Sequence, residues 1–228
     1  MILYAIPTPL GGSAAEALPP AALQTVRSLQ DFVVENAKSA RAFLKDAGCQ
    51  PRALSIVEIG DEMEILLQPL RQGRALGLLS EAGCPAIADP GAALVEAAHR
   101  DGFRVVPLVG PSSITLALMA SGLEGQRFAF CGYLPREGEQ RRKRIRELES
   151  RSRRENETEI FIETPYRNEA LLEALVSTCS SSTLLCVAAD LTLPSETIAT
   201  RSIAQWRRQA APVGRRPAVF LLLANPAG

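Results

Sequence analysis

The sequence predicts an α/β protein of two domains, with a mainly parallel sheet covered by helices in the first and a mixed sheet in the second. Three observations support this fold class. Short apolar runs alternate with helical patterns along almost the whole chain. Glycine and proline clusters separate these runs, as tight turns between strands and helices require. The chain has 228 residues, which is enough for two modest domains that each bury a core.

In the first half, apolar runs and amphipathic segments follow one another regularly. A strand, a crossover helix and the next strand form a parallel pair, and helices then cover both faces of the sheet. Proline at position 69 is expected near the end of its helix. The predicted strands are 2–6, 32–35, 54–60, 75–80 and 103–110, and the predicted helices are 20–29, 37–48, 62–73, 90–102 and 112–123.

The pattern changes after a glycine-containing stretch, and we place the domain boundary near Gly125, which gives domains 1–125 and 126–228. The second domain begins with a strand and a long charged helix. Its strands then follow at closer spacing, which indicates a mixed sheet. The predicted strands are 127–134, 159–164, 184–190, 196–202 and 217–224, and the predicted helices are 136–156, 166–178 and 203–209.

Composition excludes several classes of protein. The formal net charge is zero, so the overall balance demands neither a nucleic acid nor a membrane surface. Five cysteines without a C-x-x-C pair, together with the single histidine His99, argue against a disulfide framework and a metal site. No apolar stretch approaches the roughly 18 residues of a membrane span, and the first residues lack a signal-peptide pattern. We therefore expect a reduced, cytoplasmic protein without metal or membrane attachment.

Three loops rich in glycine, proline and small residues follow strands of the first half: 7–12 (PTPLGG), 80–91 (SEAGCPAIADPG) and 109–113 (VGPSS). Such loops gather at the carboxyl edge of a parallel sheet, where ligands bind. Small residues let backbone groups approach a ligand closely, and Ser112 or Ser113 can cap the helix that follows. Each loop alone also fits a simple turn. Neither a G-x-G-x-x-G fingerprint nor a Walker A loop is present.

In combination these loops and their neighbours resemble the tetrapyrrole-methylase superfamily, and most of all its branch of ribosomal RNA small subunit methyltransferase I, which methylates the ribose 2′-hydroxyl of a cytidine. The resemblance extends from residue 3 to about residue 223. It implies S-adenosylmethionine as methyl donor, two α/β domains with the donor in the cleft between them, and a homodimer. The segments that carry it are LYAIPTPLG, FVVENAKSARAFL, LLSEAGCPAIADPG, VVPLVGPSSITLALMASGL, FAFCGYLPR and FIETPYR.

Site residues follow from this resemblance position by position. It implies a donor site that wraps the methionine and ribose parts of S-adenosylmethionine, read mainly by backbone groups. Arg41 and Arg167 are expected to bind the acceptor, although a structural ion pair would equally account for either. The donor-binding residues implied are Pro9, Leu10, Gly11, Glu81, Ala82, Gly83, Cys84, Ser112, Ser113, Leu191 and Pro217.

The chain also departs from the branch's usual motifs, mainly on the expected acceptor side. Glu81 and Cys84 stand where the branch has aspartate and threonine, and Asn36 and Lys38 replace an acid and an arginine. A lysine of a later motif is missing from DLTLPSE, GGS replaces GNL, and RRP replaces KGE. The acceptor therefore stays open: ribosomal RNA, a tetrapyrrole-like small molecule, or none if the chain binds donor or RNA without catalysis.

Methyl transfer from a sulfonium is an in-line displacement, so alignment is the main task of the protein. A hydroxyl acceptor would need a base, and the candidates are Glu35, Glu81, Glu163 and Asp190, each of which would also fit a structural role. We expect His99 to be structural.

The helical segment 136–154 carries nine basic residues against four acidic ones. It would suit RNA phosphates, but it also fits an exposed helix face laced with ion pairs. Tyr133 and Tyr166 are expected to pack in the core or at its rim.

Overall fold

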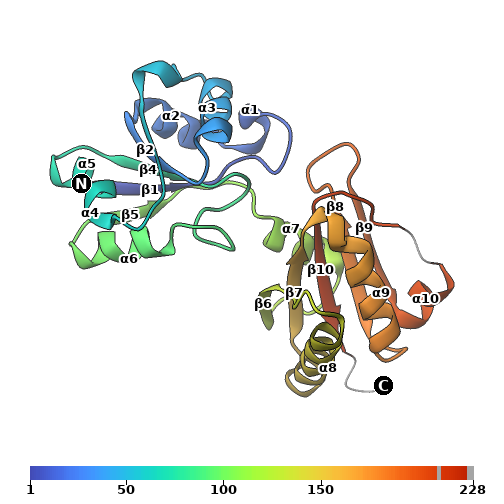
Figure 1. Cartoon of the computed structure of the whole chain (residues 1–228). Coiled ribbons are helices and arrows are strands. Elements are labelled where there is room, and N and C mark those ends of the chain that lie inside the picture. The colour runs from blue at the N-terminus through green and yellow to red at the C-terminus, as the bar shows by residue number, and fades with distance from the viewer. Residues whose placement is uncertain (210–211, 225–228) are drawn as a thin grey trace. The chain divides into compact units, whose positions relative to one another are not determined.

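The computed structural model describes residues 1–209 and 212–224. The chain divides into two compact units, Met1–Ser112 and Ser113–Gly228 (Figure 1). The sequence prediction placed the boundary 13 residues later, at Gly125. The difference is helix α7 (Ser113–Ser121), which packs on strands β8, β9 and β10 of the second sheet. The polar residues of α7 are only two serines and a threonine, so the helix lacks a distinct polar face that would indicate which sheet it covers.

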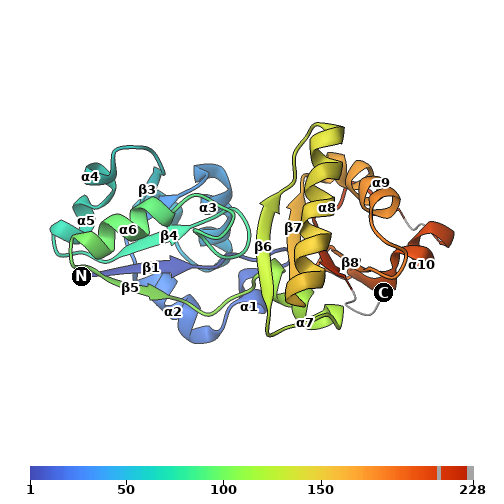
Figure 2. The same ribbon diagram turned by 90° about the horizontal axis from the view of Figure 1, so that it is seen from below.

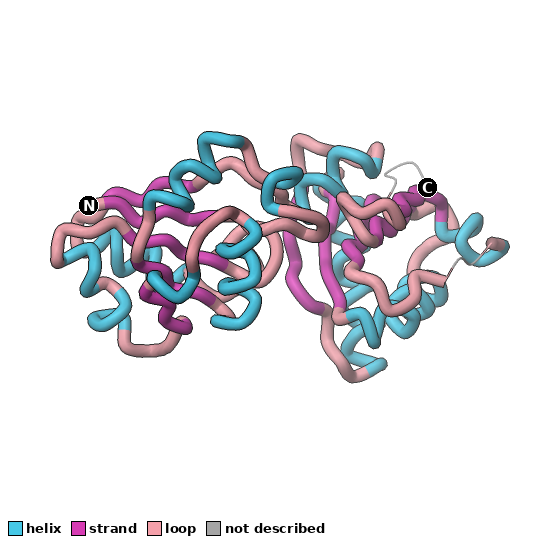
Figure 3. The backbone as a smooth tube through the Cα atoms, turned by 90° about the horizontal axis from the view of Figure 1, so that it is seen from above, coloured by secondary structure: helices cyan, strands magenta, loops and turns pink. Residues whose placement is uncertain are grey.

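The first unit contains an all-parallel sheet in the order β3-β2-β4-β1-β5. Figure 3 shows these strands side by side. All five fall inside the predicted runs, apart from Asp31 at the start of one strand, and the parallel arrangement is confirmed. The strands are β1 (Ile2–Ile6), β2 (Asp31–Val34), β3 (Ser55–Glu58), β4 (Leu76–Leu79) and β5 (Arg104–Pro107).

Helices cover both faces of this sheet, as Figure 1 shows, with α1, α2 and α3 on one side and α4, α5 and α6 on the other. Side chains alternate along each strand, so Phe32 and Val34 enter one core while Val33 enters the other. The elements are α1 (Ala14–Ala17), α2 (Pro20–Ser28), α3 (Ala37–Asp46), a 3₁₀ turn (Pro51–Ala53), α4 (Met63–Leu66), α5 (Gln68–Arg71) and α6 (Ala92–Arg100).

Two of these helices differ from the prediction. The expected helix 62–73 is broken into α4 and α5 at Leu67, and Pro69 lies in the first turn of α5 rather than near a helix end. Proline has no N–H and its ring clashes with the preceding turn, so the helix cannot continue unbroken through it. Helix α1 was not predicted. Its signal is a capping box, in which the Ser13 hydroxyl accepts from the Glu16 amide and the Glu16 carboxylate accepts from the Ser13 amide.

The strand order brings the loops after β1 and β4 together. These strands are neighbours, yet β1 leads to α1 and α2 on one face while β4 leads to α6 on the other. Such a topological switch point opens a crevice at the carboxyl ends of the two strands, and open α/β sheets bind ligands there.

The second unit contains a mixed sheet in the order β6-β7-β10-β8-β9, in which only β6 and β7 are parallel. The predicted mixed sheet is confirmed. The carboxyl ends of β7 and β8 meet the first residue of β10, since Ala218 pairs with both Glu163 and Ala189. The strands are β6 (Phe128–Tyr133), β7 (Thr158–Glu163), β8 (Leu184–Ala189), β9 (Thr197–Ser202) and β10 (Ala218–Leu223).

One face of this sheet packs against α8, α9 and α10, and the opposite face packs against α7 (Figure 2). Phe161 and Phe220 stack in the core between the sheet and helices α8, α9 and α10, with ring centroids 6.1 Å apart. No helix within residues 1–209 and 212–224 is long and apolar enough to cross a membrane. The remaining elements are α8 (Gly138–Glu155), a 3₁₀ turn (Pro165–Arg167), α9 (Asn168–Thr178) and α10 (Ile203–Arg208).

Candidate functional site

The three glycine- and proline-rich loops of the first unit converge. Thr8 and Gly83 exchange two backbone hydrogen bonds, of 2.9 and 3.0 Å, which join the loops after β1 and β4. The Thr8 hydroxyl also donates to the Ser80 carbonyl. The Cys84 thiol donates to the Pro111 carbonyl, with 3.5 Å between sulfur and oxygen, and so ties in the loop after β5. The sequence prediction that these loops share one edge of the sheet agrees with these contacts.

Glycine is required where the loops approach one another. Gly83 has φ of +80°, and a Cβ there would lie 3.3 Å from the Leu10 side chain. A Cβ on Gly110 would lie only 2.5 Å from Pro7, so any larger residue would push the first and third loops apart. The two glycines therefore allow the three loops to pack closely against one another.

The structure brings together four of the predicted donor residues in this unit. Gly83, on the second loop, approaches the Leu10 side chain on the first loop. Cys84 follows Gly83 in the chain, and its thiol hydrogen-bonds Ser112 on the third loop. Desolvation on burial raises the pKa of this thiol, which stays protonated and acts as a hydrogen-bond donor. Four other predicted donor residues lie on the same loops: Pro9, Gly11, Glu81 and Ala82. Ser113 differs, because it begins α7 in the second unit.

A cluster of carboxylates, Glu35, Glu81 and Asp89, borders these loops. Glu35 accepts a 3.0 Å hydrogen bond from the Glu81 amide, and Glu81 accepts one of 3.1 Å from the Ser39 hydroxyl. None of the three carboxylates forms an ion pair with a described lysine or arginine. The cluster is therefore an anionic border without a counter-charge among the residues described.

Asp89 is a residue that the sequence analysis did not select. Burial, followed by repulsion from Glu35 and Glu81, raises its pKa from 3.8 to about 6, and a hydrogen bond from Ser80 partly opposes this shift. Its only sequence signal is its place in the Asp-Pro-Gly turn that precedes α6, a pattern common to ordinary turns. Only the fold reveals that it faces two other acids.

The predicted site residues of the second unit lie where β7, β8 and β10 meet. Asp190 follows β8 with a left-handed φ of 54°, and its amide donates a 3.0 Å hydrogen bond to the Pro217 carbonyl. This bond places Leu191, which is buried, beside the exposed Pro217. The Asp190 carboxylate accepts from the Ser195 hydroxyl and lies 3.8 Å from Arg216.

Glu163 and Arg167 form an ion pair with each other. The Glu163 side chain is 1% exposed, and one of its oxygens also accepts from the Thr164 amide. This is the structural alternative that the sequence left open for Arg167. Arg41 differs, because it is exposed and its only described contact is a 3.3 Å hydrogen bond to the Ala37 carbonyl.

The basic segment of α8 proves to be extensively ion-paired. Arg142 and Arg146 both pair with Glu139, and Arg144 pairs with Glu147. The arginines of the last turns pair with glutamates at the helix end and on β7. Arg141 is buried. Most of the positive charge is therefore neutralised within the unit, as expected for a solvated helix face rather than a phosphate-binding surface.

His99 is exposed in the last turn of α6, a helix that runs away from the loop cluster, and so takes no part in it. Tyr133 and Tyr166 are 55% and 78% exposed, so neither packs in the core, and of the two expected positions only the rim remains. No group of three histidine, cysteine, aspartate or glutamate side chains suited to a metal ion occurs within residues 1–209 and 212–224.

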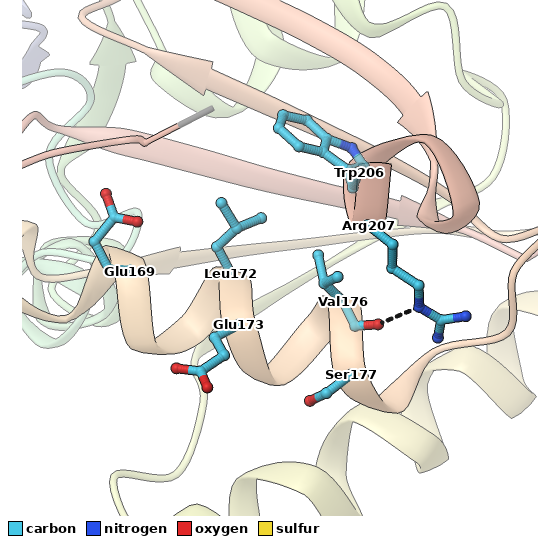
Figure 4. Close-up of a pocket in the computed structure, with 7 residues that line it drawn as sticks. All are labelled: Glu169, Leu172, Glu173, Val176, Ser177, Trp206 and Arg207. Carbon is cyan, nitrogen blue, oxygen red and sulfur yellow. Dashed lines mark hydrogen bonds between the residues drawn. The ribbon is translucent and has the colours of Figure 1, made fainter. Parts of the chain in front are cut away.

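A separate depression of about 510 Å³ lies between α9 and α10 (Figure 4). Leu172, Val176 and Trp206 form its apolar floor, with Glu169 and Glu173 at the rim. No predicted donor residue lines it. The guanidinium of Arg207 donates to the carbonyls of Val176 and Cys179 and to the Ser181 hydroxyl, so this arginine holds the end of α9 in place.

Known proteins match the chain over most of its length. The sequence profile of the family described as Tetrapyrrole (Corrin/Porphyrin) Methylases matches residues 3–206. A protein named ribosomal RNA small subunit methyltransferase I from Escherichia coli O157:H7 is 33% identical, covering 86% of this chain and 67% of the relative. The protein of that name from Xylella fastidiosa is 33% identical over 92% of this chain and 75% of its own.

Solved structures show the same fold at low sequence identity. The methyltransferase CobJ superposes with a TM-score of 0.64 at 21% identity, over 98% of this chain and 93% of its own. Uroporphyrin-III-C-methyltransferase from Thermus thermophilus gives 0.58 at 20% identity, over 99% and 96%. With the profile match and relatives at 33% identity, these findings show that the chain belongs to the tetrapyrrole methylase family.

Proposed function

We propose that this chain methylates ribosomal RNA of the small ribosomal subunit, at a ribose 2′-hydroxyl. The chain is a methyltransferase, and S-adenosylmethionine is its methyl donor. The observation that carries the choice of acceptor is the match to proteins named ribosomal RNA small subunit methyltransferase I over 86% and 92% of the chain. The solved neighbours with other substrates are only 20% and 21% identical and support the fold alone.

The loop cluster of the first unit fits this donor. Bound S-adenosylmethionine supplies a methyl group on a sulfonium, and its methionine part adds an ammonium. The chain offers three loops that converge at one edge of the sheet, and Gly83 and Gly110 let these loops pack closely. It also offers three carboxylates without a cationic partner among the described residues. Carboxylates that lack a counter-charge attract a cationic ligand, and this attraction favours the donor over its product, because the sulfur of the product is an uncharged thioether.

We assign roles to the site residues on this basis. Leu10, Gly83, Cys84 and Ser112 would hold the donor in the first unit through backbone groups and close packing. The remaining donor contacts that we propose are those that the family resemblance implies: Pro9, Gly11, Glu81, Ala82, Ser113, Leu191 and Pro217.

A hydroxyl acceptor must lose its proton during transfer. Glu163 and Asp190 are poorly suited to take it, because both are buried and already engaged with neighbouring groups. Glu35 and Glu81 stay candidates, and Asp89 joins them because its pKa of about 6 lies closer to neutrality. Arg41, exposed and without a carboxylate partner, is the better placed of the two predicted acceptor-binding arginines.

The experiment is methyl transfer to small ribosomal subunits purified from cells that lack this gene. The chain is incubated with S-adenosylmethionine carrying a labelled methyl group, and the RNA is then digested and mapped for 2′-O-methyl nucleotides. We expect label in ribosomal RNA at a ribose, and none in subunits from wild-type cells. Binding of the donor is measured in parallel by calorimetry.

Other outcomes distinguish the alternatives. Donor binding without label in RNA would favour a non-catalytic module, and label in a tetrapyrrole instead of RNA would favour a small-molecule methylase. Failure to bind either S-adenosylmethionine or its demethylated product would contradict the methyltransferase itself.

Two further proposals accompany this function. We propose a homodimer, which the family resemblance implies, and light scattering of the purified chain tests it. An apolar groove of about 380 Å³ on the second unit, which includes Met119 and Phe128, is a surface that a second copy would cover. We also propose a cytoplasmic location, because ribosomal RNA is the acceptor, and fractionation of cells tests it.

A further inference from the structure

Tyr166 is the aromatic side chain that the fold leaves most exposed among the described residues, at 78%. It lies on the 3₁₀ turn Pro165–Arg167, directly after β7. The guanidinium of Arg215 lies over its ring, 5.0 Å from the ring centroid. An aromatic ring and an arginine stacked over one of its faces thus lie on the surface of the second unit.

The backbone beneath this pair is firmly held. Asn168, which is fully buried, donates through its side-chain amide to the carbonyls of Gly214 and Arg216, at 3.1 and 2.7 Å. The Gly214 amide donates in turn to the Glu169 carboxylate at 2.7 Å. These three bonds join the turn that carries Tyr166 to the loop that carries Arg215, so the two side chains start from fixed positions.

A second cation–π pair, Arg201 with Trp206, has a structural role and so provides a comparison for Tyr166 and Arg215. The Arg201 guanidinium lies 4.9 Å from the Trp206 ring, but that ring is 2% exposed and its N–H donates to the Leu185 carbonyl. Trp206 is thus part of the core. Tyr166 buries little surface and its hydroxyl has no described partner, so stability does not explain its position.

Arg215 also differs from the arginines of α8 in its ion pairing. The described carboxylates form no ion pair with Arg215, whereas most arginines of α8 are paired. An exposed ring beside an unpaired guanidinium is the surface on which the unstacked bases of single-stranded RNA lie, while the cation attracts the RNA backbone. Arg215 is also only two residues before Pro217, a predicted donor contact.

We propose that Tyr166 and Arg215 form a stacking surface for an unpaired base of the acceptor RNA. This inference rests on the proposed function, because it names the part of the chain that contacts the RNA. It also places RNA contact on the strand-end surface of the second unit rather than on the ion-paired face of α8.

The test compares four variants for binding to small ribosomal subunits from cells that lack the gene, at fixed salt. The variants are Tyr166→Ala, Tyr166→Phe, Arg215→Ala and, as a matched control, Arg146→Ala, an exposed arginine of α8 paired with Glu139. We expect Tyr166→Ala to weaken binding by about tenfold, since stacking is worth roughly 1–3 kcal/mol per base. Tyr166→Phe keeps the ring and should bind as the unmodified chain does.

Arg215→Ala should weaken binding and lower the slope of log affinity against log salt by about 1, while Arg146→Ala should change neither. In the methylation assay, Tyr166→Ala should raise the KM for subunits with donor affinity unchanged. Thermal unfolding of each variant checks that the fold is retained.

The outcomes separate this inference from the proposed function. If the unmodified chain labels RNA but Tyr166→Ala binds and methylates subunits equally well, the stacking surface is wrong and the function stands. The stacking surface is also wrong if Tyr166→Ala and Arg146→Ala weaken binding equally. If the unmodified chain neither binds nor methylates subunits, both proposals fall.

Discussion

Thr8 and Gly83, 75 residues apart, exchange two backbone hydrogen bonds of 2.9 and 3.0 Å. This pair forms an isolated antiparallel bridge outside the parallel sheet. It joins the loop after β1 to the loop after β4 at the point where the strand connections diverge. The predicted ligand crevice of the first unit depends on it.

Replacing Gly83 by alanine tests this bridge. At φ of +80° a Cβ is strained, and it would lie 3.3 Å from the Leu10 side chain. We expect Gly83→Ala to lower the free energy of unfolding by about 1 kcal/mol and to weaken donor binding several-fold, because the loop must shift. Gly60→Ala is the control, since no atom lies within 4 Å of its Cβ position. Denaturant unfolding and calorimetry provide the readouts, and equal behaviour of both variants would contradict the role of Gly83.

Ser112→Trp tests the third loop. Ser112 is half-buried and hydrogen-bonds the Cys84 thiol, so an indole at this position would project where the loops converge. We expect donor binding to disappear while the circular dichroism spectrum and melting temperature stay close to those of the unmodified chain. Ser28→Trp, at an exposed position at the end of α2, should bind the donor normally. Undiminished donor affinity of Ser112→Trp would place the site elsewhere.

The carboxylate cluster predicts a pH dependence of stability. Burial, with repulsion from Glu35 and Glu81, raises the pKa of Asp89 from 3.8 to about 6. A raised carboxyl pKa means that folding favours the protonated form, so this contribution is fully present below about pH 3.8 and is lost as the pH rises through about 6. Without the donor, Asp89 therefore destabilises the first unit at pH 8.

Asp89→Asn should remove this penalty. Because Asp89 is only partly buried, we expect a gain of about 1 kcal/mol at pH 8 and little change at pH 4. The melting temperature at pH 8 should rise by about 2–4 °C. Asp61→Asn, at an exposed position, should alter stability at neither pH. A gain of the same size for Asp89→Asn at both pH values would show that the charge of Asp89 is not the cause.

Replacing Asn168 tests whether its hydrogen bonds stabilise the surface that carries Tyr166. Asn168→Ala leaves the carbonyls of Gly214 and Arg216 without their donor in a buried position. We expect the free energy of unfolding, measured by denaturant titration, to fall by about 2 kcal/mol. We also expect weaker binding of small ribosomal subunits. Gln24→Ala, at an exposed position of α2, is the control. Intact stability would mean that the two segments are held by other contacts.

The alternation of apolar runs and amphipathic segments was sufficient to predict the parallel and mixed sheets, because side-chain periodicity follows from strand and helix geometry. The loops of the first unit were also predictable, since Gly83 and Gly110 occupy positions where only glycine fits. The capping box of Ser13 and Glu16 was visible in the sequence, yet it lies in a short helix with a single buried residue. Such a helix leaves no periodic signal.

What the sequence determined by itself is the class of fold, the order of its strands and most of its helices, and the three loops proposed to bind the donor, because these depend on local pattern. The tertiary structure decided what depends on distant residues: that Glu163 binds Arg167, that the arginines of α8 are paired, and that Asp89 faces two other acids. It also decided that Tyr166 stays exposed beside Arg215. A charge or a ring in a sequence has no partner until the chain folds, and the partner determines whether it stabilises the structure or remains free to bind.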